Sequence, residues 1–188
     1  MKKILVVAAH PDDETLGAGG TILKHKANGD NVSWLIVTNI NEKDGYKKSH
    51  VELREKEIDL VAEKYNFDNV FKLEIPTSTL STSSLFNLIP KISNIFKDLE
   101  PEVIYTMNRS DAHSDHRIIF DAVMSCTKSF RHPYVKSVLM YECLLLYEFD
   151  NLGACPLPAQ QAFKKDDKCR ADPTIDEMKN RMRETCLE

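Results

Sequence analysis

The stretch VVAAHPDDETLGAGG, residues 6–20, places one imidazole and three carboxylates directly after a run of apolar residues. These side chains belong to His10, Asp12, Asp13 and Glu14. A buried charge is costly unless it is paired or coordinates a metal. Imidazoles and carboxylates are the ligands of catalytic zinc sites, which use three protein ligands and keep a fourth position open. The pattern therefore predicts half of a metal site and requires further ligands elsewhere in the chain.

A second stretch, NRSDAHSDHR at residues 108–117, supplies the other half of such a site. It contributes four candidate side chains: Asp111, His113, Asp115 and His116. His10 and Asp13 are three positions apart across a turn stiffened by Pro11, so they can converge on one ion. His116 can complete the set of three ligands from the second stretch. Asp12 would then point elsewhere and be free to accept a proton from water.

Each stretch taken singly has a simpler interpretation. His-Pro-Asp-Asp is more often a turn that leads into a helix, with Asp12 or Asp13 accepting backbone N–H bonds. His113 and His116 alone would more often be surface residues that open a helix. The metal interpretation is favoured because both polar groups follow apolar strands that we expect to be neighbours. The remaining histidines lack such a setting and are expected to be ordinary surface or loop residues: His25, His50 and His132.

Short β-rich runs alternate with longer helical segments along the chain. The pattern predicts strands over residues 3–9, 31–38, 69–75, 102–107 and 135–142. It predicts helices over residues 14–28, 49–65, 83–99 and 115–130, with Pro90 at a kink or a break. This alternation is typical of a Rossmann-like three-layer α/β/α fold with a mostly parallel sheet. Ligands in such folds bind beyond the C-terminal ends of the strands, where both polar stretches are expected to lie.

The bulk composition limits the classes of function. A chain of 188 residues is long enough for one domain, and a net charge of -4 favours neither nucleic acid nor an anionic membrane as a partner. We expect no transmembrane segment and no secretory signal, because the apolar run at residues 4–9 is short and ends in charged residues. Five cysteines without a CxxC pair suggest reduced thiols and a cytoplasmic location. A homo-oligomer remains compatible with the sequence.

The motif AHPDDE after the first strand, with HSDH after a later one, resembles the PIG-L/LmbE family of zinc-dependent N-deacetylases. The similarity covers residues 1–142 and includes REKE at residues 54–57. It implies a Rossmann-like fold and hydrolysis of a small-molecule N-acetyl amino sugar, such as N-acetylglucosamine, or a glycoconjugate. It also implies Zn2+ held by His10, Asp13 and His116. Another divalent transition metal, such as iron or cobalt, would accept the same ligands.

The resemblance further implies catalytic roles for three residues. Asp12 matches the general base of the family. His113 matches the residue that stabilises the tetrahedral intermediate. Asp115 lies where a carboxylate would orient His113, and such a carboxylate would favour its imidazolium form. Glu14 is expected to support the metal loop or the helix N-terminus.

Substrate contacts are expected from three further residues. Arg54 matches a family residue that contacts a substrate hydroxyl, although a solvated arginine paired with Glu57 is an equal alternative. Asn108 and Asp111 lie in the second polar stretch and could contact the sugar or form turns.

Two segments depart from the family pattern. IPTSTL at residues 75–80 lacks a carboxylate that many relatives carry there. Residues 143–188 do not resemble the Glu-rich substrate loop, strand and helix with which relatives continue, so we hypothesise a changed reading frame near residue 143 or a truncated chain. The sequence thus predicts a deacetylase domain over residues 1–142 and an atypical C-terminal tail over residues 143–188. The alternatives are an amidase acting on another sugar conjugate, and a metal-binding remnant whose incomplete pocket reduces or abolishes activity.

Overall fold

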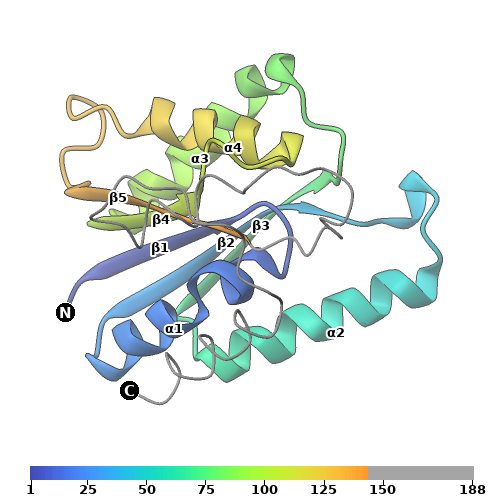
Figure 1. Cartoon of the computed structure of the whole chain (residues 1–188), viewed down its shortest axis with the longest axis horizontal. Coiled ribbons are helices and arrows are strands. Elements are labelled where there is room, and N and C mark those ends of the chain that lie inside the picture. The colour runs from blue at the N-terminus through green and yellow to red at the C-terminus, as the bar shows by residue number, and fades with distance from the viewer. Residues whose placement is uncertain (144–188) are drawn as a thin grey trace, which may run out of the picture. The chain divides into compact units, whose positions relative to one another are not determined.

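The computed structural model describes residues 1–143, which are built around a five-stranded parallel sheet (Figure 1). The strand order is β3-β2-β1-β4-β5. The strands are β1 (Lys3–Ala8), β2 (Asn31–Asn39), β3 (Asn69–Pro76), β4 (Val103–Met107) and β5 (Ser137–Tyr141). The prediction of a mostly parallel α/β fold is confirmed. The predicted atypical tail, apart from its first residue Cys143, lies outside the described residues.

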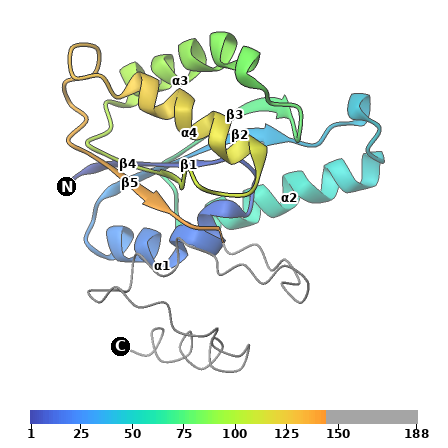
Figure 2. The same cartoon turned by 45° about the horizontal axis from the view of Figure 1, so that its top comes forward.

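Four helices cover the two faces of the sheet. They are α1 (Asp13–Ala27), α2 (Lys48–Tyr65), α3 (Leu85–Leu99) and α4 (Ser114–Cys126). Helices α1 and α2 lie on one face and α3 and α4 on the other, so the residues form three layers (Figures 1 and 2). Short 3-10 helices precede α2 and α3, at Glu42–Asp44 and Thr82–Ser84. Within residues 1–143, none of the helices is long and apolar enough to span a membrane.

The central strands are continuously apolar because helices cover them on both sides. Residues 4–9 of the first strand and the following loop are each at most 1% exposed. Helix α3 continues through Pro90, which is exposed and lies in the second turn, so the helix is not divided there. Helix α4 ends at Cys126, four residues before the predicted end. There the hydroxyl of Thr127 donates to the carbonyl of Met124 and competes with further helical bonds.

The order of the strands reverses direction at β1, whose neighbours are β2 and β4. β1 and β4 are paired in parallel, with Ile4 opposite Val103. The segments that follow these two strands therefore emerge side by side at one edge of the sheet. Open α/β sheets bind their ligands at such a switch point. This edge carries both polar stretches that the sequence singled out.

Candidate metal centre

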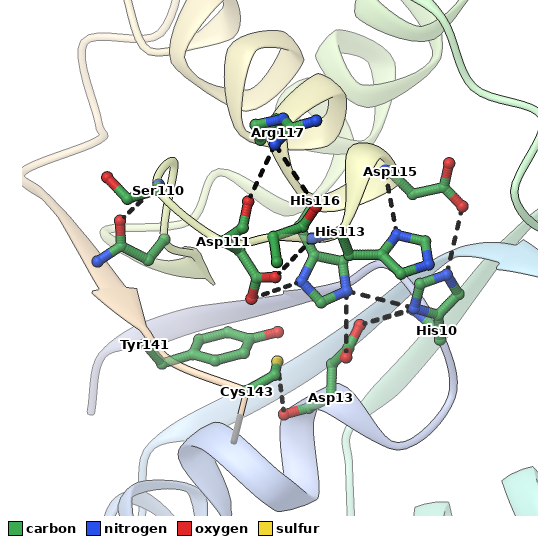
Figure 3. Close-up of polar contacts among 12 residues, drawn as sticks. His10, Asp13, Ser110, Asp111, His113, Asp115, His116, Arg117, Tyr141 and Cys143 are labelled. Carbon is green, nitrogen blue, oxygen red and sulfur yellow. Dashed lines mark hydrogen bonds and ion pairs between the residues drawn. The ribbon is translucent and has the colours of Figure 1, made fainter. Parts of the chain in front are cut away.

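Three side chains from the two polar stretches converge at the switch point (Figure 3). His10 follows β1, Asp13 begins α1, and His116 lies in the first turn of α4. The backbone N–H of His10 donates to Oδ2 of Asp13 at 2.8 Å, which fixes the turn between them. Nδ1 of His10 lies 3.3 Å from Nε2 of His116 and 3.6 Å from Oδ2 of Asp13. Nε2 of His116 lies 3.4 Å from Oδ1 of Asp13.

The spacing of these atoms fits a tetrahedral metal ion. Ligand atoms bonded to zinc at about 2.0–2.1 Å lie about 3.3 Å from one another in a tetrahedral site. The two imidazole nitrogens lie 3.3 Å apart. Each faces one carboxylate oxygen of Asp13, Oδ1 at 3.4 Å from His116 and Oδ2 at 3.6 Å from His10. Two of the three side chains are almost completely buried, Asp13 at 4% and His116 at 1% exposed. The donor set and its geometry therefore suit a divalent ion with room for further ligands.

Each candidate histidine ligand contacts a carboxylate through its other ring nitrogen. Nε2 of His10 lies 3.3 Å from Oδ2 of Asp115. Nδ1 of His116 lies 2.9 Å from Oδ2 of Asp111, in an ion-pair contact. Carboxylates in this position orient ligating imidazoles and raise their basicity. The contact of Asp115 with His10 was not expected, since the sequence placed this carboxylate beside His113. Asp111 forms the turn that was one of its two expected roles, because its Oδ1 accepts the backbone N–H of His113 at 2.9 Å, and it contacts His116 in addition.

The carboxylates make this centre attractive to positive charge. Burial by itself would lower the pKa of His10, but Asp115 and Asp13 raise it to about 9. Burial likewise opposes protonation of His116, yet Asp111 and Asp13 raise its pKa to about 9. Against its burial, the contacts with the two imidazoles hold the pKa of Asp13 well below its usual range. A metal ion would replace the two protons, because ligating imidazoles must be neutral.

Asp12 occupies the N-cap position of α1 without capping it. Its side chain makes no capping hydrogen bond within residues 1–143. Partial burial, and then the nearby charge of Asp13, raise the pKa of its carboxyl group. The carboxylate borders a cavity beside the three converging side chains. The simpler interpretation as a capping residue therefore does not account for the position of Asp12, whose oxygens are available to a ligand.

His113 opens α4 and faces the same centre from the other side. Its ring centroid lies 4.6 Å from that of His10 and 5.0 Å from that of His116. Nδ1 of His113 accepts the backbone N–H of Asp115 at 3.2 Å, which leaves the proton of the neutral ring on Nε2. Burial and the charges of His10 and His116 lower the pKa of His113. The geometry thus indicates a neutral N–H donor, whereas an imidazolium was expected.

Other side chains near the centre widen the choice of metal ligands. Within residues 1–143, three overlapping groups have ligand atoms within 4.8 Å of one another. The groups are His10, His113 and His116; Asp13, His116 and Cys143; and His10, Asp12 and Asp13. Cys143 was not expected in this role, because the sequence places it where the resemblance to the family ends.

A cavity of about 500 Å³ opens beside the centre, toward α2. Among the residues that line it are Asp12, Tyr46, His50, Leu53, Arg54 and Glu57. Nε of Arg54 lies 3.5 Å from Oε2 of Glu57, so this arginine both forms the ion pair and faces the cavity. Within residues 1–143, Asn108 is not among the residues that line the cavity. Its side-chain oxygen accepts the backbone N–H of Ser110 and forms a turn.

Sequence reasoning missed several residues at this edge. The backbone N–H of Ser78 donates to Oδ2 of Asp115 at 2.8 Å. Ser78 belongs to IPTSTL, the segment that lacks a carboxylate of its own. Its backbone therefore binds the carboxylate of Asp115. Tyr46, in the segment between β2 and α2, and His50, in the first turn of α2, also line the cavity. The only available signal was position, since all these residues follow the C-terminal end of a strand.

Comparisons with known proteins give a consistent result. Residues 5–127 match the family described as PIG-L: GlcNAc-PI de-N-acetylase. The chain is 27% identical over 147 residues to the uncharacterized deacetylase YaiS of Escherichia coli (strain K12), covering 75% of this chain and 74% of YaiS. It is similar to the crystal structure of the conserved protein TT1542 from Thermus thermophilus, with 26% identity and a TM-score of 0.64 over 78% of this chain and 69% of TT1542.

A further similar structure is that of N,N'-diacetylchitobiose deacetylase from Pyrococcus horikoshii. It shares 22% identity with this chain, with a TM-score of 0.61, and the match covers 74% of this chain and 60% of that one. At this identity the likeness concerns the fold. The fold therefore occurs in a set of proteins that includes deacetylases.

Proposed function

The chain belongs to the PIG-L family of de-N-acetylases, and on that premise we propose that it is a metal-dependent hydrolase of an N-acetylated amino sugar or its conjugate. The products are acetate and a free amine. The observation that carries this proposal is the convergence of His10, Asp13 and His116, at separations of 3.3 to 3.6 Å, beside a cavity that exposes Asp12.

The metal would be held by His10, Asp13 and His116, with zinc favoured by the mixed imidazole and carboxylate ligands. A divalent ion at this centre supplies Lewis-acid chemistry, because it lowers the pKa of water and polarises a carbonyl group. Asp111 and Asp115 keep the two imidazoles in orientation through their second ring nitrogens. Zinc is therefore the metal that we propose for this centre.

Asp12 and His113 would carry the proton transfers. The raised pKa of Asp12 makes its carboxylate a stronger base toward the attacking water. Nε2–H of His113 would donate to the oxygen of the tetrahedral intermediate, where negative charge develops. The protonated Asp12 then delivers its proton to the departing amine, because a neutral His113 has no proton to spare. Asp115 contributes by fixing both His10, through its carboxylate, and His113, through its backbone N–H.

The cavity suits a small polyhydroxylated substrate. Its volume of about 500 Å³ lies within the range of small-molecule sites. Arg54, Glu57, Tyr46 and His50 supply polar groups along its wall. The relative from Pyrococcus horikoshii is named for an acetylated sugar, which supports a sugar here. We place the enzyme in the cytoplasm, because both cysteines in residues 1–143 are free thiols.

Acetate release from a panel of N-acetylated sugars, including N-acetylglucosamine and N,N'-diacetylchitobiose, tests this function. Asp12→Asn should retain the metal, measured by elemental analysis, and lose turnover by about 10²- to 10⁴-fold. Asp59→Asn, on an exposed position of α2, is the matched control and should keep full activity. Release of a larger acid from sugar conjugates with longer N-acyl groups, without acetate from the panel, would favour the alternative amidase. Stoichiometric metal without turnover of any sugar would favour the remnant.

A further inference from the structure

Cys143 lies beside the metal centre, although the proposed reaction does not use it. Its side chain is 8% exposed, and Figure 3 shows its sulfur next to Asp13. Sγ of Cys143 lies 3.8 Å from the backbone oxygen of Asp13. Ligand atoms of Cys143, Asp13 and His116 all lie within 4.8 Å of one another. The thiol thus shares two neighbours with the candidate metal ion.

The fold fixes this position of the thiol. The hydroxyl of Tyr141, at the end of β5, donates to the backbone oxygen of Val7 at 2.6 Å and anchors this segment on β1. Gly17 of α1 allows the segment to approach closely, since a Cβ at this position would lie 2.2 Å from Cδ2 of Tyr141 and 2.7 Å from the backbone oxygen of Glu142. The residue after Glu142 is therefore brought to the N-terminus of α1, where Asp13 lies.

The second described cysteine shows what a purely structural thiol looks like in this protein. Cys126 is fully buried in the core and donates to the backbone oxygen of Ile89 at 3.4 Å. By contrast, Cys143 lies next to two residues of the candidate metal centre, Asp13 and His116, which are 4% and 1% exposed. A thiol beside a buried imidazole and a buried carboxylate completes a ligand set that zinc prefers.

We propose that Cys143 is an alternative fourth ligand, which joins His10, Asp13 and His116 and closes the metal site. This inference rests on the metal centre of the proposed function and adds a second state to it. Catalytic zinc sites keep one position open, whereas sites with four protein ligands are closed and structural. The closed state is therefore inactive, and substrate or water must displace the thiolate before turnover.

The step needs a small displacement and releases one proton. Sulfur and nitrogen ligands of a tetrahedral zinc ion lie about 3.6 Å apart, so a separation near the 4.8 Å limit would have to shorten by about 1 Å. An S–metal bond replaces the S–H bond, and the proton passes to the solvent. A soft ligand favours zinc and cadmium over manganese, so the identity of the metal would set the balance between the closed and open states.

Cobalt substitution of the full chain tests the sulfur ligand without relying on activity. Wild-type protein and Cys126→Ser should bind one Co2+ and show a thiolate-to-cobalt charge-transfer band in the near ultraviolet. Cys143→Ser should bind Co2+ and lose this band. One bound Co2+ without the band in the wild type, or a band that survives in Cys143→Ser, overturns the inference. Failure of the wild type to bind Co2+ would instead remove the metal centre on which the proposed function rests.

A second measurement on the wild type alone guards against misfolding of the variant. Alkylation of the native protein, followed by mass spectrometry, compares the peptides that contain Cys143 and Cys126. Added zinc should slow modification of Cys143 and leave that of Cys126 unchanged. Equal rates for Cys143 with and without one equivalent of bound zinc would contradict the proposal.

Discussion

Two histidine–carboxylate clusters lie at opposite ends of the sheet. The metal-site cluster (His10, Asp13 and His116) follows the C-terminal ends of β1 and β4. The His25 cluster (His25, Asp30 and Tyr105) involves the last turn of α1 and the residue before β2. There Nδ1 of His25 lies 2.7 Å from Oδ2 of Asp30, and Nε2 lies 2.9 Å from the hydroxyl of Tyr105.

The difference between the clusters lies in how the ring nitrogens are satisfied. Both nitrogens of His25 have one well-placed partner each, so its hydrogen-bonding capacity is complete. In the metal-site cluster, nitrogens of His10 and His116 face each other at 3.3 Å, with Asp13 against both. In this arrangement, unlike that of His25, several ligand atoms surround one common point. Convergence of donors, rather than the presence of histidine and aspartate, therefore indicates a metal site.

Removing one histidine from each cluster tests most directly whether only the metal-site cluster binds metal. His116→Ala should lose the bound metal and reduce acetate release by at least about 10³-fold, because a catalytic metal contributes several kcal/mol to the transition state. His25→Ala should bind metal normally and keep its turnover per folded molecule. Metal content and acetate release measure both effects. Equal metal loss in the two variants would contradict the distinction.

The carboxylates behind the metal-site cluster give the next largest effect. Asp111→Asn and Asp115→Asn keep the shape of each side chain but remove the charge that supports His116 and His10. Metal affinity should fall by about 10- to 100-fold in each variant. Competition with a chromophoric chelator measures this affinity. Asp121→Asn, which removes a surface ion pair with Arg109, is the control, and an equal loss there would discount the orienting role.

The His25 cluster should contribute to stability instead. His25→Leu leaves the hydroxyl of Tyr105 and the carboxylate of Asp30 without their shared partner. The free energy of unfolding should fall by about 1–3 kcal/mol, the usual cost of leaving partly buried polar groups unpaired. Urea unfolding of metal-free protein measures the change. A variant as stable as the wild type would show that water replaces the imidazole at no cost.

The sequence predicted the fold and the convergence of the loops better than the individual contacts. Continuous apolar runs define β1 and β2, and parallel strands bring the loops after β1 and β4 to one edge. The partner of Asp115 could not be predicted, because it depends on the direction of a side chain in the first turn of α4. His132 shows the same limit. It was expected to be an ordinary surface or loop residue and does lie in the loop between α4 and β5. Yet it is 1% exposed and contacts Ser93 and Tyr134 through its two ring nitrogens.

The smallest effect that we expect is a pH dependence of stability in the His25 cluster, which arises from Asp30. The hydrogen bond with His25, followed by the backbone N–H of Lys2, lowers the pKa of Asp30 below its ordinary value of 3.8. The folded state therefore binds this proton more weakly than the unfolded state. Its contribution to stability is complete above about pH 4 and is lost as the pH falls through the lowered pKa.

Comparison of Asp30→Asn with the wild type isolates this contribution. The wild type should be more stable at pH 6, and the difference should shrink as urea unfolding is repeated at successively lower pH below 3.8. In a His25→Leu background the pH dependence should weaken but persist, because the N–H of Lys2 still donates to Asp30. A difference that stays constant down to the lowest pH would mean that the folded and unfolded states protonate Asp30 alike. The contact with His25 would then position the helix end without stabilising the charge, whereas in the metal-site cluster the charge of the carboxylates is what attracts the ion.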